Sequence, residues 1–252
     1  MVRLGIVACQ IFEDELATIL NAHPGIGGIV MRRTKENRRV ARHLSRLPTY
    51  CNDYDLLPSR CTGMEILVEV LPAALHTSPE GLADACNEAI DAMKLTTRTV
   101  LLLYGLCGNA LSGVFSRSDV HLVTLEDGGI ADDCFAGLLG KEPYLRELER
   151  QGSFFLTKGW VTHWDAIAPR IAGTGGMGTM LAQERYERTL YIAQNGVDDE
   201  ESLLRAERLS SDLALPQERA EGCLQLLVSA LERGMHAART APRIPPRIRR
   251  HQ

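Results

Sequence analysis

The feature that most constrains the fold of this chain is a series of short apolar runs separated by helix-like segments. Thr97–Leu103 (TRTVLLL) ends in an unbroken β-branched and leucine run, and Glu65–Leu71 (EILVEVL) and Leu4–Ala8 are similar. Strands that are apolar on both faces are typical of a parallel sheet covered by helices on both sides. Their alternation with helical segments predicts an α/β fold, with a Rossmann-like, mostly parallel sheet flanked by helices.

Beyond residue 152 the pattern becomes mainly helical. After one more extended segment, we predict three helices, at residues 180–193, 200–213 and 217–233. The last residues combine five arginines with prolines, and proline removes backbone donors that a helix needs. We therefore predict an α/β domain, a mainly helical part packed on it and a disordered basic tail, at residues 1–152, 153–238 and 239–252.

Composition and charge exclude several classes of protein. The chain has 252 residues, of which 45% are hydrophobic and 24% charged, as in globular proteins. No apolar run reaches the roughly 18 residues needed to cross a bilayer, and the first residues lack the order of a secretory signal. A net charge of -4 gives no general attraction to nucleic acid or membranes. We predict a cytoplasmic protein whose partner is a small-molecule substrate.

Three cysteines follow three of the predicted strands. Cys9 ends the first strand, Cys107 lies in the turn after the central one (LLLYGLCGNAL), and Cys134 comes between a later strand and a helix. Because parallel strands share one carboxyl edge, where α/β proteins place their sites, we expect the three thiols to converge. The amino ends of helices stabilise thiolates, which bind soft metals and attack electrophiles. Two interpretations of these cysteines are therefore open: they form a shared reactive site, or they are buried core residues.

Other candidate residues belong to the same predicted edge. His76 follows the Glu65 strand run and precedes a helix, so it is a candidate metal ligand, proton donor or phosphate contact. Asp133 is a candidate general acid or an acceptor for a metal ligand, and its alternative role is the N-cap of the next helix. Cys86 and Cys223 are predicted to be core residues. No Cys-x-x-Cys pair is present, so a metal site must combine distant parts of the chain.

The segments LPAALHTSPE, LLYGLCGN and DDC, followed by FFLTKGW, resemble the family named domain of unknown function 1638. The resemblance spans roughly residues 2–195, and members are often encoded beside corrinoid-dependent methyltransferases. It implies Cys9, Cys107, Cys134 and His76 as site positions and a methyltransferase or corrinoid protein as a candidate partner. It brings no assigned reaction. The family has a Pro-Arg-x-His-Asp-Cys stretch where this chain reads GIADDC, without the basic residues.

These observations predict a metalloenzyme whose centre is bound by Cys9, Cys107 and Cys134. Three thiolates leave one coordination position for a substrate, which suits either an iron-sulfur (4Fe-4S) cluster with one open iron or a Zn²⁺ site. The enzyme would be a lyase or transferase in sulfur or one-carbon chemistry, with Cys107, His76 and Asp133 as catalytic residues.

Two alternatives stay open. The first is metal-free covalent catalysis, in which Cys107 is the nucleophile and His76 the base. The second is a non-catalytic accessory protein of corrinoid methyl transfer.

Overall fold

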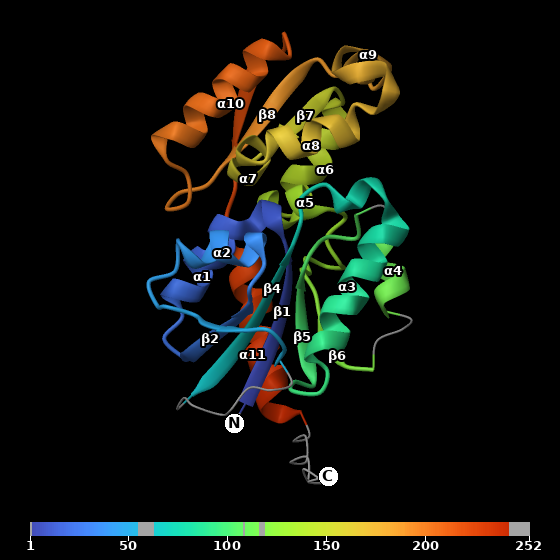
Figure 1. Cartoon of the computed structure of the whole chain (residues 1–252). Coiled ribbons are helices and arrows are strands. Elements are labelled where there is room, and N and C mark those ends of the chain that lie inside the picture. Colours follow the sequence, from blue (N-terminus) through green and yellow to red (C-terminus); the bar gives the residue numbers. More distant parts are fainter. Residues whose placement is uncertain (1, 55–62, 108, 116–118, 242–252) are drawn as a thin grey trace, which may run out of the picture.

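The structure is a computed structural model that describes residues 2–54, 63–107, 109–115 and 119–241 (Figure 1). Two lobes stand one above the other in this view. The lower lobe contains the amino-terminal part of the chain and the last helix, and the upper lobe contains the segment between them. None of the helices formed by the described residues is both long and apolar enough to span a membrane.

A six-stranded sheet forms the centre of the first lobe, with the strand order β3-β2-β4-β1-β5-β6. The strands are β1 (Val2–Cys9), β2 (Ile26–Arg32), β3 (Thr49–Cys51), β4 (Met64–Leu71), β5 (Thr99–Leu103) and β6 (His121–Val123). Every neighbouring pair is parallel. The predicted α/β, Rossmann-like fold is therefore confirmed.

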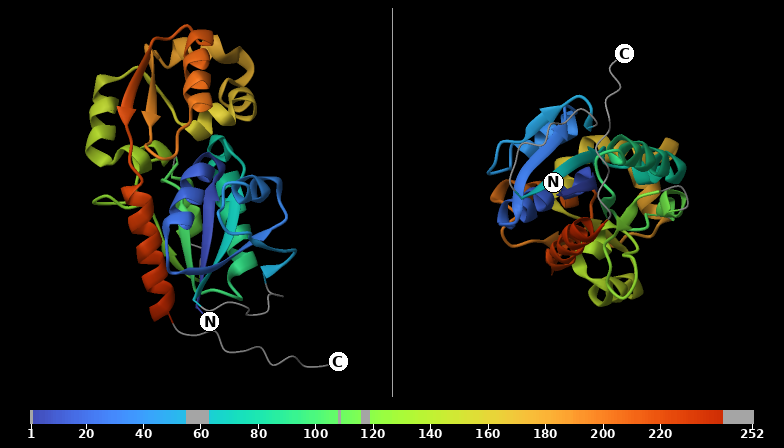
Figure 2. Two further views of the ribbon diagram at one scale, coloured as in Figure 1. Left: turned by 90° about the vertical axis from the view of Figure 1, so that its left-hand side faces the viewer. Right: turned by 90° about the horizontal axis from the view of Figure 1, so that it is seen from below.

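Helices cover both faces of this sheet, as the doubly apolar strands require. They are α1 (Glu13–Ala22), α2 (Lys35–Ala41), α3 (Pro79–Met93), α4 (Ala110–Phe115) and α11 (Gln225–Thr240). Gly5 of β1 faces Met93 of α3, whereas its neighbour Leu4 faces Gly234 of α11. Because successive strand residues point to opposite faces, α3 and α11 lie on opposite sides of the sheet. Figure 2 shows α11 running alongside the first lobe.

The position of β1 explains where the site lies. β1 is central, with Cys9 paired to Leu71 of β4 and Ala8 paired to Leu103 of β5. β4 and β5 are buried over their whole length, as their apolar sequences predict. Cys9 therefore stands at the middle of the carboxyl edge of the sheet, where the loops that follow β5 and β6 can reach it.

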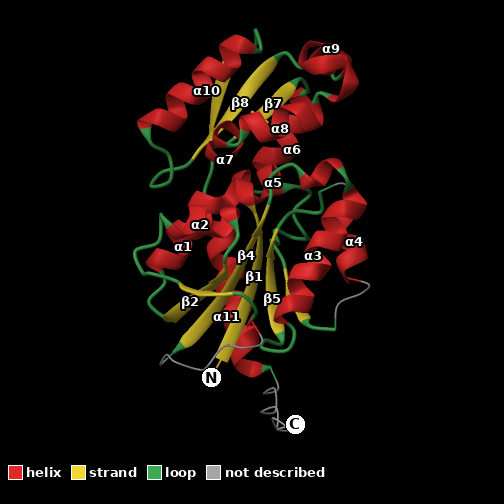
Figure 3. Ribbon diagram, viewed as in Figure 1, coloured by secondary structure: helices red, strands yellow, loops and turns green. Residues whose placement is uncertain are grey.

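The second lobe is rich in helices, as predicted, and it also has a sheet of its own, of which the sequence indicated only one extended segment (Figure 3). Its parallel strands have the order β7-β8-β9, with β7 at Ser153–Leu156, β8 at Arg188–Ala193 and β9 at Gln217–Glu221. The helices of this lobe are α6 (Lys141–Arg150), α7 (Lys158–Thr162), α8 (Trp164–Ile171), α9 (Gly176–Gln183) and α10 (Glu200–Asp212).

Two of the predicted helices are shorter than expected, because part of each predicted range forms a strand. The helix predicted at 180–193 ends at Gln183, because the β-branched and aromatic run at 189–192 pairs as β8 instead. The helix predicted at 217–233 begins only at Gln225, because the polar segment before it pairs with β8 as β9. Tertiary pairing thus overrides the helix preference of Gln217–Glu221. α11 continues to Thr240, so Arg239 belongs to a helix, and residues 242–252 of the predicted tail lie outside the described residues.

Candidate functional site

The structure brings the three predicted thiols together. Cys9 is the last residue of β1, Cys107 lies in the loop after β5, and Cys134 is the first residue of α5 (Cys134–Leu139). The sulfur atoms of Cys107 and Cys134 are 3.9 Å apart. The Cys134 thiol also forms a hydrogen bond with the Cys9 thiol. The predicted convergence of the strand ends is confirmed, and these three residues are called the thiol group below.

Two loops hold Cys107 beside Cys134. The backbone N–H of Cys107 donates to the carbonyl oxygen of Asp132 at 3.0 Å. Gly105 packs so closely on the backbone of Asp133 that a Cβ atom at this position would overlap it. Cys107 has a φ angle of 47°, a left-handed conformation that side chains other than glycine rarely adopt. The surrounding contacts therefore maintain a strained position for this thiol.

The thiols are not equivalent electrostatically. The pKa of Cys9 is lowered, chiefly because the Cys134 thiol donates to it, with further donation from the backbone of Ile11 and Gln10. The pKa of Cys134 is raised by its hydrogen bonds with Cys107 and Cys9 and by burial. Cys9 is thus the member of this pair that ionises first. Cys107 differs from both in being partly exposed, while Cys9 and Cys134 are buried.

A fourth thiol lies near the thiol group. Cys86 of α3 is fully buried, as predicted for a core residue, whereas Cys223, for which the same was predicted, is exposed. Burial raises its pKa to about 12, and Cys9 and Cys107 add to the increase. Tyr104 is also buried, and its pKa is raised by burial and by all four cysteines. The apolar face of α3 was recognisable in the sequence, but its placement over β1 was not.

His76 stands at the junction between the lobes. It lies in the short helix η3 (Leu75–Thr77), and its ring centroid is 6.1 Å from that of Trp160 in the second lobe. Burial lowers the pKa of His76. The structure therefore places this side chain against an aromatic ring of the second lobe. Its predicted roles as a metal ligand or a base stay predictions.

Asp133 caps α5 and extends toward the second lobe. Its Oδ1 atom accepts a hydrogen bond from the backbone of Ala136 at 2.8 Å, and its Oδ2 atom accepts one from the Tyr144 hydroxyl at 2.7 Å. Burial raises the pKa of Asp133. The N-cap role weighed from the sequence is confirmed, and the general-acid role stays a prediction.

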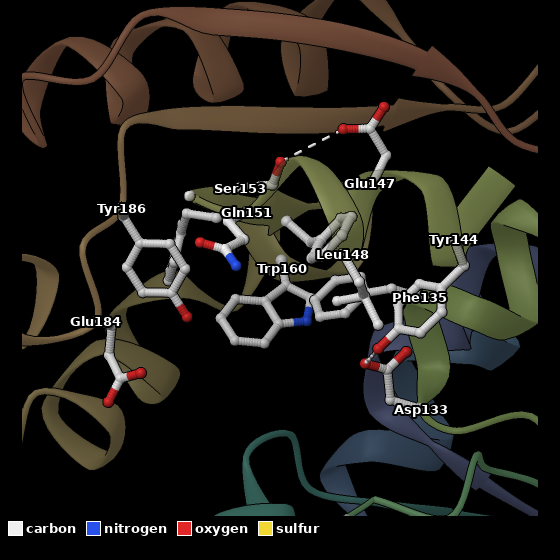
Figure 4. Close-up of a pocket in the computed structure, with 13 residues that line it drawn as sticks. Asp133, Phe135, Tyr144, Glu147, Leu148, Gln151, Ser153, Trp160, Glu184 and Tyr186 are labelled. Carbon is white, nitrogen blue, oxygen red and sulfur yellow. Dashed lines mark hydrogen bonds between the residues drawn. The ribbon is translucent and has the colours of Figure 1, made fainter.

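A cavity of about 350 Å³ opens beside Asp133 (Figure 4). Its lining is rich in aromatic rings, namely Phe135, Tyr144, Phe154, Phe155, Trp160 and Tyr186. Burial and the neighbouring Asp133 raise the pKa of Tyr144, which lines the cavity. Sequence reasoning missed this cavity. The aromatic residues of the FFLTKGW segment are the one signal that pointed to it.

A buried cluster of charges lies beside the thiol group and was also missed. It consists of Glu13, Asp14 and Glu15 at the start of α1 with Lys158 and His163 of the second lobe, and is called the carboxylate junction below. Glu13 Oε1 lies 3.0 Å from His163 Nε2, and Asp14 Oδ1 lies 3.6 Å from Lys158 Nζ. Burial raises the pKa of Glu15 to about 8. His163 is buried at this junction.

The family model described as "Protein of unknown function (DUF1638)" matches residues 70–231, more than half of the chain. The chain belongs to the DUF1638 family. The match includes His76, Cys107, Cys134 and most of the second lobe, while Cys9 precedes it. Searches of the curated proteins and of the solved structures found no match. The DUF1638 assignment agrees with the resemblance seen in the sequence and carries no reaction with it.

The fit of a metal ion to this DUF1638 site can be judged from the side chains. Among the described residues, no group of three or more His, Cys, Asp and Glu side chains is arranged so that it could hold a metal ion. The pair of Cys107 and Cys134 is close enough to share one ion, and Cys9 reaches the pair through Cys134. The thiol group therefore has the right donors, but a complete ligand set requires a side chain to turn.

Proposed function

We propose that this DUF1638 protein is an enzyme in which the thiol group holds one thiophilic metal ion, and in which a small-molecule substrate binds in the adjoining cavity. The observation that carries the proposal is the 3.9 Å separation of the Cys107 and Cys134 sulfur atoms. Two thiolates on one tetrahedral zinc ion, each bound at ~2.3 Å, are about 3.8 Å apart. The separation thus suits two ligands of the same ion.

The same distance favours a single ion over an iron-sulfur cluster. Each cysteine of a four-iron cluster binds a different iron, so its thiolates lie farther apart than two ligands of one ion. Zn²⁺ is therefore the metal we propose. Cys9, at the carboxyl end of β1, completes the set if its side chain turns toward Cys107.

The exposure of the thiols assigns their roles. Cys107 is the partly exposed member and is the thiol that a substrate can reach, whereas Cys9 and Cys134 are buried and serve to fix the site. A bound zinc ion would act as a Lewis acid and keep a thiolate available at neutral pH, as sulfur and one-carbon transfer require. Asp133 and Tyr144, which are joined by a hydrogen bond and line the cavity, would orient a substrate there.

A second candidate function is covalent catalysis by Cys107 without a metal. The exposure of Cys107 and its strained backbone favour this alternative. His76 remains the base that this alternative predicts. The accessory role in corrinoid methyl transfer has no contact in the structure to support it over these two.

Metal analysis of the anaerobically purified protein tests the proposal, with Cys107→Ser and Cys86→Ser as a matched pair. We expect about one zinc per chain in the wild type and in Cys86→Ser, and a loss of at least 90% of it in Cys107→Ser, with both variants folded. Equal metal loss in the two variants would show an effect on folding rather than ligation.

Each of the other outcomes would support a different function for this protein. A brown protein with several irons per chain overturns the single-ion proposal. A metal-free protein whose Cys107 reacts fastest with iodoacetamide supports covalent catalysis instead. A metal-free, unreactive protein that binds cobalamin supports the accessory role.

A further inference from the structure

We propose that the cavity beside Asp133 binds a small organic cation of the substituted-ammonium class. This inference names the substrate class of the site and rests on the proposed function for the reaction that follows binding. The binding itself can be measured without any reaction. Three observations carry it, namely the aromatic lining, the sign of the lining charges and the size of the space.

Aromatic rings dominate the lining. Figure 4 shows the indole of Trp160 at the centre of the cavity, with Phe135 beside it, Tyr186 on one side and Tyr144 on the other. The faces of aromatic rings carry partial negative charge, and they attract an ammonium group more strongly as the site excludes water. Several rings around one space are the arrangement that recognises quaternary ammonium groups.

The charged groups of the lining have one sign. Asp133, Glu147 and Glu184 contribute carboxylates, and none of the described residues that line the cavity is Lys, Arg or His. Glu147 is paired with Arg150 at 3.2 Å and with Arg188 at 3.4 Å, so its charge is compensated from outside the cavity.

Asp133 differs from Glu147 in its partners. The hydrogen bonds of its carboxylate come from neutral donors, the Tyr144 hydroxyl and the backbone of Ala136. A cation in the cavity would supply the positive charge that these donors lack. An anionic ligand would instead meet this carboxylate with no basic lining residue to balance it, which is unfavourable in a partly buried site.

The size of the cavity selects among cations. About 350 Å³ is at the lower end of the range for small-molecule sites. It accommodates a trimethylammonium head with a short substituent. A bare metal ion needs oxygen ligands gathered at one point, and the described residues form no such group. The lining therefore fits a bulky, weakly hydrated organic cation better than an inorganic one.

Choline and 3,3-dimethyl-1-butanol provide the test, because they have the same shape and differ in the charged nitrogen. We expect isothermal titration calorimetry on the full chain to show choline binding about 3- to 30-fold more tightly, the range that one cation–π contact contributes. Equal affinities, tighter binding of the alcohol, or no binding of either probe to folded protein would overturn the proposal.

Two variants locate the binding. Asp133→Asn removes the charge but keeps a good N-cap and an acceptor for Tyr144, so the fold should persist. It should weaken choline binding about tenfold and leave the affinity for the alcohol unchanged. Tyr186→Leu should weaken choline binding, while Tyr50→Leu, which removes a ring in the first lobe, should not. An unchanged choline affinity in both Asp133→Asn and Tyr186→Leu would place the binding elsewhere and overturn the proposal.

Cys107→Ser separates this inference from the function on which it rests. The variant should lose the metal and retain choline binding, because Cys107 is not among the residues lining the cavity. Choline binding in a protein that never contains metal would sustain the cation site and reject the metal centre. Metal without choline binding would do the reverse.

Discussion

The thiol group and the carboxylate junction both adjoin the carboxyl end of β1, but they differ in how their polar atoms are partnered. Two acids of the junction face cations, with Glu13 contacting His163 and Arg39, and Asp14 contacting Lys158. The third, Glu15, is buried and its pKa is raised to about 8. The thiols face one another, backbone amides and the hydroxyl of Tyr104. Glu13 and Asp14 are thus electrostatically compensated, whereas the thiols lack a balancing cation among their named contacts.

This difference separates structural from chemical roles. The junction connects α1 of the first lobe with α7 of the second, and Gly159 at the start of α7 packs directly on the backbone of Ile11. It therefore sets the position of the second lobe, whose residues form much of the cavity. The thiol group is built from the end of β1, the loop after β5 and the start of α5. Changes to the junction should alter stability first, while changes to the thiol group should alter chemistry first.

The largest effect is expected for Glu15→Gln, through pH. Burial raises the pKa of Glu15 from 4.5 to about 8, so the folded chain retains a proton that the unfolded chain releases. This group's contribution to stability is therefore greatest below about pH 4.5 and is lost as the pH rises toward 8. The loss is on the order of 4 to 5 kcal/mol. Glu15→Gln should remove this pH dependence. In urea unfolding at pH 5, 6.5 and 8, the free energy of unfolding of the variant should exceed that of the wild type most at pH 8.

Glu201→Gln is the control for this experiment, because Glu201 lies on α10 and is largely exposed. Its stability should follow the wild type at every pH. Parallel pH profiles for wild type and Glu15→Gln would show that Glu15 is ionised in the folded protein at neutral pH, and the buried acid would then need a cation that these contacts do not include.

Gly105→Ala and Gly159→Ala each disturb one of the two regions, the thiol group and the carboxylate junction respectively. In each case the added Cβ overlaps backbone, of Asp133 for Gly105 and of Ile11 for Gly159. Each should lower the free energy of unfolding by about 2 to 3 kcal/mol. Only Gly105→Ala should separate the Cys107 loop from Cys134 and slow the bridging of these thiols by dibromobimane, followed by mass spectrometry. Slower bridging in Gly159→Ala as well would mean that the second lobe also positions the thiols.

Lys158→Met should cost about 1 to 2 kcal/mol, because it leaves Asp14 buried without its nearest lysine. Asp14 already has a raised pKa from burial, which Lys158 opposes, so this acid should take up a proton more readily in the variant. Cys107→Ser should cost less than 1 kcal/mol, since it exchanges one small, partly exposed side chain for another. Thermal denaturation of both variants measures the contrast, and a larger loss for Cys107→Ser would assign the thiol group a structural role.

Sequence reasoning predicted what depends on local pattern and on the direction of parallel strands. The apolar runs located β1, β4 and β5, and the helix expected after His76 is α3. The thiols were predicted to meet because a parallel sheet places all of its carboxyl ends at one edge. That argument needs no knowledge of side-chain contacts.

The rest depended on tertiary contacts that a local pattern does not contain. β9 has the polar sequence QERAE and exists because β8 lies beside it. Cys86 approaches the thiol group because α3 packs across β1, and the cavity joins Asp133 with Tyr186, 53 residues later. The acids at the start of α1 are buried beside Lys158 and His163 of the second lobe, which lie about 145 to 150 residues later in the chain.

The smallest effect is expected for truncation after Ala241, which removes the prolines and the last four arginines. The predicted tail began at residue 239, but α11 extends to Thr240 and belongs to the core, where Met235 is buried and Arg233 donates to the Thr124 carbonyl at 2.7 Å. The remaining residues are rich in Pro and Arg and offer few apolar groups for packing. The free energy of unfolding should change by less than about 0.5 kcal/mol, with metal content and choline affinity unchanged.

Truncation after Ala230 is the matched control and should unfold the first lobe, because it removes Met235 and Gly234 from the face of the sheet. If the truncation after Ala241 lost metal or choline binding, the basic segment would have to reach the carboxyl edge of the sheet. That segment would then contribute to the thiol group or to the cavity.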